Sequence, residues 1–191
     1  MEFEAIKEFK LREAFHRSDV TFEDFCNRYL EHSERGKFYV YDDTNEGCST
    51  ITYDTSGIGS EKILTVLNDH HIECILIKID GKLYQLNTKC DCALLANRYI
   101  AFVEFKSNAL NSSDASIEQH YEKAKNQIEQ TYIQLNSDCN ALGVDLSSIK
   151  RIAIAVFNKT VPDNNAMQKK FSASFLLKNH FKLVFSNEIK L

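Results

Sequence analysis

The spacing of apolar and polar residues changes along the chain and separates a helical N-terminal part from a part that mixes strands and helices. Over Glu2 to Arg17, apolar residues recur at intervals of about three or four, which predicts a helix with one buried face. Thr21, followed three residues later by Asp24, indicates the start of a second helix that we expect to extend to His32. The N-terminal part is therefore predicted to be helical.

Two short segments rich in Tyr and Thr follow, at 37–41 and 49–53. The turn-prone residues between them predict a β-hairpin. The glycine-containing turn 57–60 then leads into 61–68, whose Ile and Leu residues are spaced for one side of a helix. We therefore expect a hairpin followed by a short helix.

A period of two begins after residue 73 and predicts three consecutive strands. The first is 74–79, Asp80-Gly81 is a two-residue hairpin signal, and the second is 82–86, with a continuation as far as Leu95. The third is 99–106. Strands joined by short turns pair antiparallel, so a three-strand meander is expected.

The C-terminal part predicts a long helix over 116–135, a strand at 149–157, a helix at 166–178 and a strand at 181–185. A strand, helix and strand in succession imply parallel pairing through a right-handed crossover. The predicted fold class is α/β. We expect a central mixed β-sheet, built from the three-strand meander, the crossover helix and further strands, and flanked by helices.

The length of 191 residues and the hydrophobic content of 43% are enough for one core, so a single compact domain is expected. The net charge of −4 is unevenly distributed: residues 1–60 carry 13 acidic and 7 basic side chains, whereas 61–191 carry 14 acidic and 16 basic ones. Phosphate contacts come from Lys and Arg, so only the second part offers a surface for DNA. We divide the domain into an accessory N-terminal extension, 1–56, and a core, 57–191. The acidic extension is expected to face away from nucleic acid and to dock a second copy of the chain or a partner protein.

The first residues are acidic and amphipathic and lack the pattern of a signal peptide. The longest apolar runs are too short to cross a bilayer. The six cysteines are scattered through the predicted helices and strands, which favours free thiols in a reducing compartment. These features predict a cytoplasmic protein without membrane association.

Two charged residues interrupt the most apolar predicted strand. Glu104 and Lys106 follow the apolar run 101–103 and, being two residues apart, point to the same face. Burial of an unpaired charge is costly, so a sheet holds both inside only if they pair or hold a metal. Asp91 lies on the preceding strand, and the turn at 97–98 brings it alongside Glu104. We expect the three groups to converge; the alternative is an exposed ion pair at the end of an edge strand, with Asp91 in a loop.

The segments Cys90-Asp91 and Glu104-Phe105-Lys106, placed between a meander and a helix, resemble the motif of the PD-(D/E)XK nuclease superfamily. The resemblance covers about Gly59 to Phe185. The proline that usually precedes the first acid is Cys90 here, a change that removes no metal ligand. The resemblance implies a restriction-endonuclease-like core with Asp91, Glu104 and Lys106 as catalytic residues.

The resemblance further implies that Asp91 and Glu104 bind Mg²⁺, for which carboxylates are suitable hard ligands and Mn²⁺ a substitute. Lys106 is expected to orient the attacking water or lower its pKa, and to offset negative charge on the phosphate. The expected activity is that of a DNA endonuclease with a restriction or phage-defence role, leaving 5′-phosphate and 3′-hydroxyl ends. The alternatives are a catalytically inactive binding or scaffolding subunit with the same fold, and an RNA-cleaving or RNA-processing enzyme.

Weaker candidates surround the motif. The resemblance implies an additional metal-assisting acid on the first core helix, and Glu61 matches it by location, with Glu73 as its rival. On the long predicted helix, Gln119, Lys123 and Gln127 are spaced four residues apart and form one stripe, which we expect to contact nucleic acid. The same stripe could equally be a solvated face.

Overall fold

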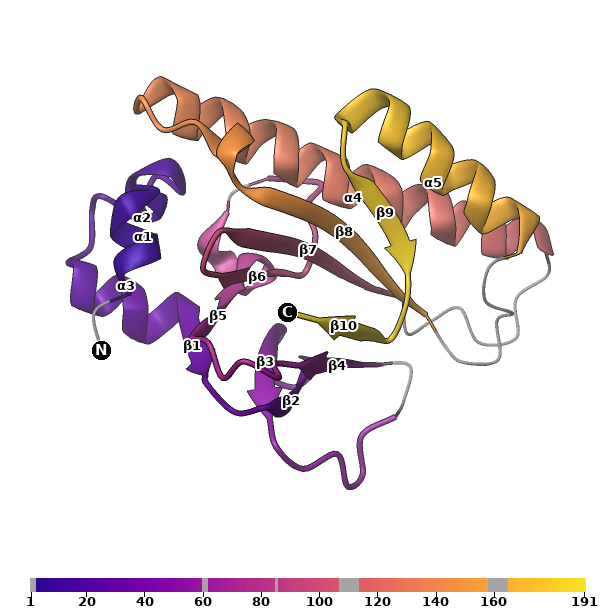
Figure 1. The fold of residues 1–191 in the computed structure, drawn as a ribbon, viewed down its shortest axis with the longest axis horizontal. Helices are drawn as coiled ribbons and strands as arrows, with labels where there is room; N and C mark the ends of the chain where they lie inside the picture. Colours follow the sequence, from indigo (N-terminus) through magenta and orange to yellow (C-terminus); the bar gives the residue numbers. More distant parts are fainter. Residues whose placement is uncertain (1–2, 60–61, 85, 107–113, 158–164) are drawn as a thin grey trace.

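The computed structural model describes residues 3–59, 62–84, 86–106, 114–157 and 165–191. Within them, two mixed β-sheets pack face to face, and helices cover the outer face of the larger sheet (Figure 1). This arrangement agrees with the predicted α/β class. The prediction of helical flanks holds for one face only, because the other face of the larger sheet packs against the smaller sheet.

The larger sheet has six strands in the order β1-β5-β6-β7-β8-β9. Their bounds are Leu30–Ser33 (β1), Cys74–Lys78 (β5), Cys92–Ala96 (β6), Tyr99–Lys106 (β7), Lys150–Phe157 (β8) and Lys182–Phe185 (β9). Strands β5, β6 and β7 form the expected antiparallel meander, and β7, β8 and β9 run parallel. The predicted crossover connection is therefore present.

The smaller sheet has four strands in the order β10-β4-β2-β3. Their bounds are Glu188–Lys190 (β10), Ile63–Leu67 (β4), Lys37–Asp43 (β2) and Cys48–Thr52 (β3). Strands β2 and β3 form the predicted hairpin. Strands from both sides of residue 56 contribute to each sheet, and the proposed division into 1–56 and 57–191 stays a prediction.

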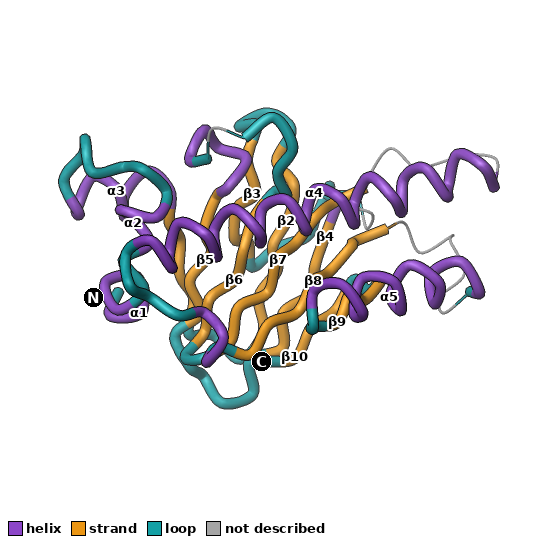
Figure 2. Tube along the Cα trace, turned by 90° about the horizontal axis from the view of Figure 1, so that it is seen from above, coloured by secondary structure: helices purple, strands orange, loops and turns teal. Residues whose placement is uncertain are grey.

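The helices are Glu4–Glu8 (α1), Leu11–Ala14 (α2), Phe22–Tyr29 (α3), Asp114–Ala141 (α4) and Ala166–Asn179 (α5). Figure 2 shows α4 and α5 lying across the strands of the larger sheet. The sequence predicted α4, α5 and the start of α3, where the Thr21 hydroxyl accepts a hydrogen bond from the Asp24 N–H at 3.1 Å. Within the described part of the chain, no helix combines the length and the apolar content that crossing a bilayer requires.

The predicted single helix over Glu2 to Arg17 is wrong, because the chain forms α1 and α2 with a break between them. Lys10, at the break, has a left-handed backbone with φ of 47°. Phe9 and Leu11 are only two residues apart, so a continuous helix cannot turn both to one side. The break allows both side chains to be buried, with exposed fractions of 5% and 2%.

The predicted helix at 61–68 is also wrong, since its described residues contain strand β4. Leu64 and Val66 are fully buried, whereas the residues between and beside them are half-buried, which is the alternation of a strand. Pairing with β2 and β10 decides the conformation. The apolar spacing alone was compatible with either element.

The predicted hairpin at Asp80-Gly81 does not form. Ile79–Leu83 is a π-helical turn, and β5 pairs antiparallel with β6 on one side and with β1 on the other. Ile79 and Leu83 are both fully buried in the core between the helices and the larger sheet. The turn therefore replaces the predicted strand 82–86 because it places two apolar side chains, four residues apart, in the same core.

Candidate active site

The structure brings Asp91, Glu104 and Lys106 together at the end of two neighbouring strands. Strand β7 lies inside the larger sheet, between β6 and β8, and carries Glu104 and Lys106 on one face. Asp91 immediately precedes β6, and its N–H donates to the Val103 carbonyl at 3.1 Å. The antiparallel register thus aligns Asp91 with Glu104, as the sequence predicted.

The two charged residues on β7 are buried, which excludes the alternative of an exposed ion pair. Glu104 is 2% exposed and Lys106 is 7% exposed. The Lys106 ammonium donates to Glu104 Oε1, while Glu104 Oε2 is buried without a hydrogen-bond partner. The carboxylate of Asp91 accepts a hydrogen bond from the Phe105 N–H at 2.6 Å. The second oxygen of Glu104 is therefore left without compensation, a costly arrangement in a buried position.

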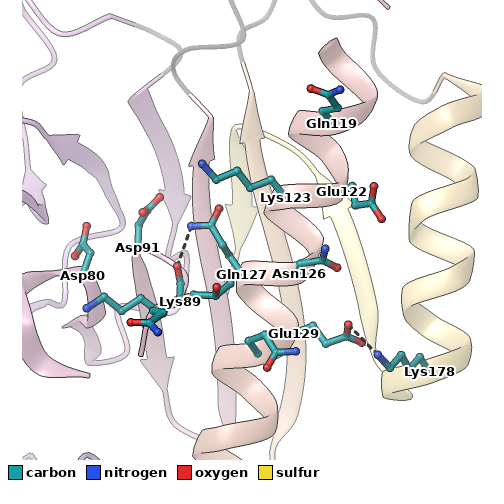
Figure 3. Close-up of a pocket in the computed structure, with 13 residues that line it drawn as sticks. Asp80, Lys89, Asp91, Gln119, Glu122, Lys123, Asn126, Gln127, Glu129 and Lys178 are labelled. Atoms are coloured by element: carbon teal, nitrogen blue, oxygen red, sulfur yellow. Dashed lines mark hydrogen bonds and ion pairs between the residues drawn. The ribbon is translucent and has the colours of Figure 1, made fainter. Parts of the chain in front are cut away.

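Asp91 forms part of the wall of a cavity of about 1000 Å³ between the sheet and α4 (Figure 3). Glu104 and Lys106 are buried beside this cavity rather than lining it. The rest of the lining is polar and comes mainly from the loop before β6 and from α4: Asp80, Asn87, Thr88, Lys89, Gln119, Glu122, Lys123, Asn126, Gln127, Glu129, Gln130 and Lys178. Such a surface suits a hydrophilic ligand.

Asp80 is a site residue that the sequence did not reveal. It sits in the π-helical turn after β5, its N–H donates to the Asp91 carbonyl at 3.0 Å, and it lies beside Asp91 in Figure 3. Its Oδ1 atom is buried without a partner. The sequence did contain an indication of this role, because Asp80 is an acidic residue at the end of the apolar run 74–79. Asp80-Gly81 was interpreted instead as a hairpin turn.

The carboxylates destabilise one another electrostatically. Burial, followed by the charge of Asp91, raises the pKa of Asp80 to about 7. Burial raises the pKa of Asp91 to about 6, against the opposing effects of the Phe105 N–H and the Lys106 ammonium. Burial and then the charge of Asp91 raise the pKa of Glu104 well above its usual range. A bound cation would relieve this repulsion.

Asp42, near the end of strand β2, adds an acidic side chain from the smaller sheet to the candidate site. Burial raises the pKa of Asp42, and the Lys106 charge opposes this shift. Asp42 in turn contributes to the raised pKa values of Asp80 and Asp91. This part of the N-terminal extension therefore lies near the candidate site, and not away from it as expected.

The stripe on α4 divides into residues with different surroundings. Gln127 is half-buried and hydrogen-bonds to Lys106 and to the Lys89 carbonyl. Lys123 is exposed and points toward Asp91 in Figure 3, and its positive charge opposes the rise that burial causes in the pKa of that carboxyl. Gln119 is exposed at another part of the cavity wall. All three line the cavity, where Gln119 and Lys123 are exposed to solvent, and contact of the stripe with nucleic acid stays a prediction.

The carboxylates of the candidate site are the type of ligand that the expected Mg²⁺ prefers. The described residues contain no group of three or more His, Cys, Asp or Glu side chains already arranged to hold a metal ion. Mg²⁺ is commonly held by one or two carboxylates together with water and substrate phosphate. Asp91 and Glu104 provide two carboxylates, and Oε2 of Glu104 is a ligand oxygen that has no other partner. Glu61, the additional candidate ligand, lies outside the described residues.

Comparison with known proteins identifies no relative: the chain matches no family model, no curated protein and no solved structure. The geometry and electrostatics of the site are therefore the basis for assigning a function.

Proposed function

We propose that the protein is a Mg²⁺-dependent endonuclease that hydrolyses DNA phosphodiester bonds, with Asp91, Glu104 and Lys106 as its catalytic residues. The observation that carries the proposal is the burial of Glu104 and Lys106 next to Asp91, which itself forms part of the wall of an open polar cavity. Buried ionisable groups with strongly shifted pKa values cluster at functional sites, and this is the warrant for assigning a function to the site. The restriction-endonuclease-like motif is the second support, and a restriction or phage-defence role follows from that resemblance.

Asp91 and Glu104 would hold the Mg²⁺, with Mn²⁺ as a substitute, through their carboxylate oxygens. When bound, the ion would polarise a phosphate oxygen and lower the pKa of a water molecule. Lys106 would hold a positive charge where negative charge develops on the phosphate. Lys123 and Gln119, both exposed on the cavity wall, would contact the DNA strand.

A second candidate is a catalytically inactive binding or scaffolding subunit with the same fold. It is favoured by the direct ion pair between Lys106 and Glu104, which compensates one oxygen of Glu104 without a metal. Measurement of divalent-metal affinity distinguishes the two, because a scaffolding subunit has no need to bind Mg²⁺ or Mn²⁺.

The proposal is tested by incubating the protein with plasmid DNA, single-stranded DNA and single-stranded RNA over a range of Mg²⁺ and Mn²⁺ concentrations. We expect metal-dependent cleavage of DNA that stops on chelation, and the Asp91→Ala protein is the control. Cleavage restricted to RNA would assign the alternative substrate. Equal cleavage by wild type and Asp91→Ala would instead indicate a contaminant, and no cleavage of any substrate would refute the proposal.

A further inference from the structure

Gln127 makes hydrogen bonds with both ends of its side-chain amide. Its Oε1 accepts from the Lys106 ammonium at 2.6 Å, and its Nε2 donates to the Lys89 carbonyl at 2.9 Å (Figure 3 marks the second bond). An ammonium can only donate and a carbonyl can only accept, so this orientation of the amide is the only one that satisfies both partners. Gln127 therefore connects two parts of the candidate site.

The connection reaches both sides of the site. Lys106 is two residues after Glu104, and Lys89 is two residues before Asp91. One turn further along α4, the Thr131 hydroxyl accepts from the Cys90 N–H at 2.8 Å and donates to the Gln127 carbonyl at 2.9 Å. Helix α4 thus holds the segment that leads into Asp91 at two consecutive positions.

We infer that Gln127 is a positioning residue that keeps the Lys106 ammonium in place and fixes the backbone before Asp91, instead of contacting nucleic acid. This inference rests on the proposed nuclease function for its effect on rate. It separates Gln127 from its neighbours on the stripe, because Gln119 and Lys123 are exposed and available to a ligand.

The rate test uses the Gln127→Leu variant, which removes both hydrogen bonds at similar volume. Misplacing a catalytic group by about an ångström reduces the rate on the order of a hundredfold, so we expect a tenfold to hundredfold slower single-turnover cleavage, roughly, with the Kd values for DNA and Mn²⁺ unchanged. Gln134→Leu is the matched control, since Gln134 lies on the same helix and donates to Asp138 at 3.0 Å. It should cleave at the wild-type rate.

A double-mutant cycle with Lys106→Ala distinguishes positioning from substrate contact. If Gln127 acts mainly through Lys106, adding Gln127→Leu to Lys106→Ala should reduce the rate by clearly less than Gln127→Leu alone does, because the Gln127–Lys106 bond is already absent and only the bond to the Lys89 carbonyl is lost. The Gln127→Glu variant keeps an acceptor for Lys106 and should recover part of the rate. A full additional loss in the double variant, or weaker DNA binding by Gln127→Leu, would overturn the inference.

A measurement on the unmodified protein does not depend on activity. The side-chain amide protons of Gln127 should exchange with solvent at least tenfold more slowly, roughly, than those of exposed Gln119, because hydrogen bonding and partial burial protect them. Equal exchange rates would refute the positioning role. If the Gln127 protons are protected but the protein cuts no substrate, the nuclease proposal is contradicted. The hydrogen bonds of Gln127 to Lys106 and Lys89 are then still supported.

Discussion

At the scale of single residues, the candidate site is a set of charges with incomplete compensation. Glu104 has one oxygen paired with Lys106 and the other buried without a partner, and Asp80 has a buried oxygen without a partner. Uncompensated buried charge lowers the stability of the folded state. Such arrangements persist where a ligand or a reaction makes use of them, so each charge should have a separable function.

The three motif residues are expected to differ in what their removal affects. Asp91→Ala and Glu104→Ala each remove a metal ligand, so Mn²⁺ affinity and cleavage should fall together. Lys106→Ala should still bind Mn²⁺, while its cleavage rate should fall by at least about a hundredfold, the usual loss for one preorganised electrostatic group. Calorimetry with Mn²⁺ and single-turnover cleavage assays measure both quantities. Full Mn²⁺ affinity in Asp91→Ala, or a wild-type rate in Lys106→Ala, would show that the roles are assigned wrongly.

Asp80 is expected to make stability depend on pH. Its pKa is raised to about 7 from the ordinary value of 3.8, so between these pH values the folded protein retains a proton that the unfolded chain releases. The native state then binds more protons, and stability falls as the pH rises through this range. In Asp80→Asn the decrease in stability between these pH values should be smaller, because only the raised pKa values of Asp91 and Glu104 still contribute to it.

Thermal denaturation at a series of pH values, in a chelator, measures this effect. Asp19→Asn is the control, because Asp19 is exposed on the surface. A stability profile of Asp80→Asn that runs parallel to that of the wild type would show that Asp80 ionises freely in the folded protein.

At the scale of elements, one side chain connects strands of the two sheets. Glu31 on β1 accepts hydrogen bonds from the Thr50 hydroxyl and the Ile51 N–H of β3, both at 2.6 Å, and forms an ion pair with Lys78 at 2.5 Å. The carboxylate thus joins the edge of the smaller sheet to β1 and β5 of the larger one. Hydrogen bonds to charged groups contribute more than neutral ones.

Glu31→Ala is therefore expected to lower the free energy of unfolding by about 2 kcal/mol, because it leaves the Ile51 N–H without its acceptor. Urea denaturation measures the loss. Glu34→Ala, a change at an exposed neighbour, should cost less than about 0.5 kcal/mol. Equal effects of the two substitutions would contradict a connecting role for Glu31.

At the scale of the whole molecule, the larger sheet takes part in two cores, one under the helices and one against the smaller sheet. We expect the two sheets to unfold together. Phe38 is fully buried between the two sheets. Its replacement by Ala should lower the free energy of unfolding by about 3–5 kcal/mol, and unfolding should remain a single cooperative transition. Urea unfolding followed by circular dichroism and by Tyr fluorescence tests both points. Non-coincident curves would instead support a separately folding accessory region.

Metal binding should be visible in the stability of the whole molecule. An ion that binds only the folded state stabilises it by about 2.7 kcal/mol at a hundred times its Kd. Above the raised pKa values of Asp80 and Asp91, Mn²⁺ should therefore increase the melting temperature of the wild type and have little effect on Asp91→Ala. A chelator should reverse the increase. Equal stabilisation of both proteins would place the metal elsewhere.

The features that depend on local signals could be predicted from the amino-acid sequence alone. Helix α4 follows from its apolar period, the start of α3 from the Thr21 cap, and the β2–β3 hairpin from its turn residues. The meeting of Asp91 with Glu104 was also predictable, because antiparallel neighbours joined by a short turn fix which residues lie opposite. In each case the residues that determine the feature lie within a few positions of one another, or on two strands that a short hairpin turn connects.

The other features depend on contacts between segments that lie far apart in the sequence. Strand β4 depends on pairing with β2 and β10, and the π-helical turn that presents Asp80 depends on a core that it shares with α3 and the larger sheet. Gln127 looked like a candidate for binding nucleic acid, and its bonds to Lys106 and Lys89 emerge only when α4 packs on the sheet. The physical reason is the same throughout: short apolar runs and single polar side chains are compatible with several environments, and the free energy that selects one comes from partners distant in the sequence.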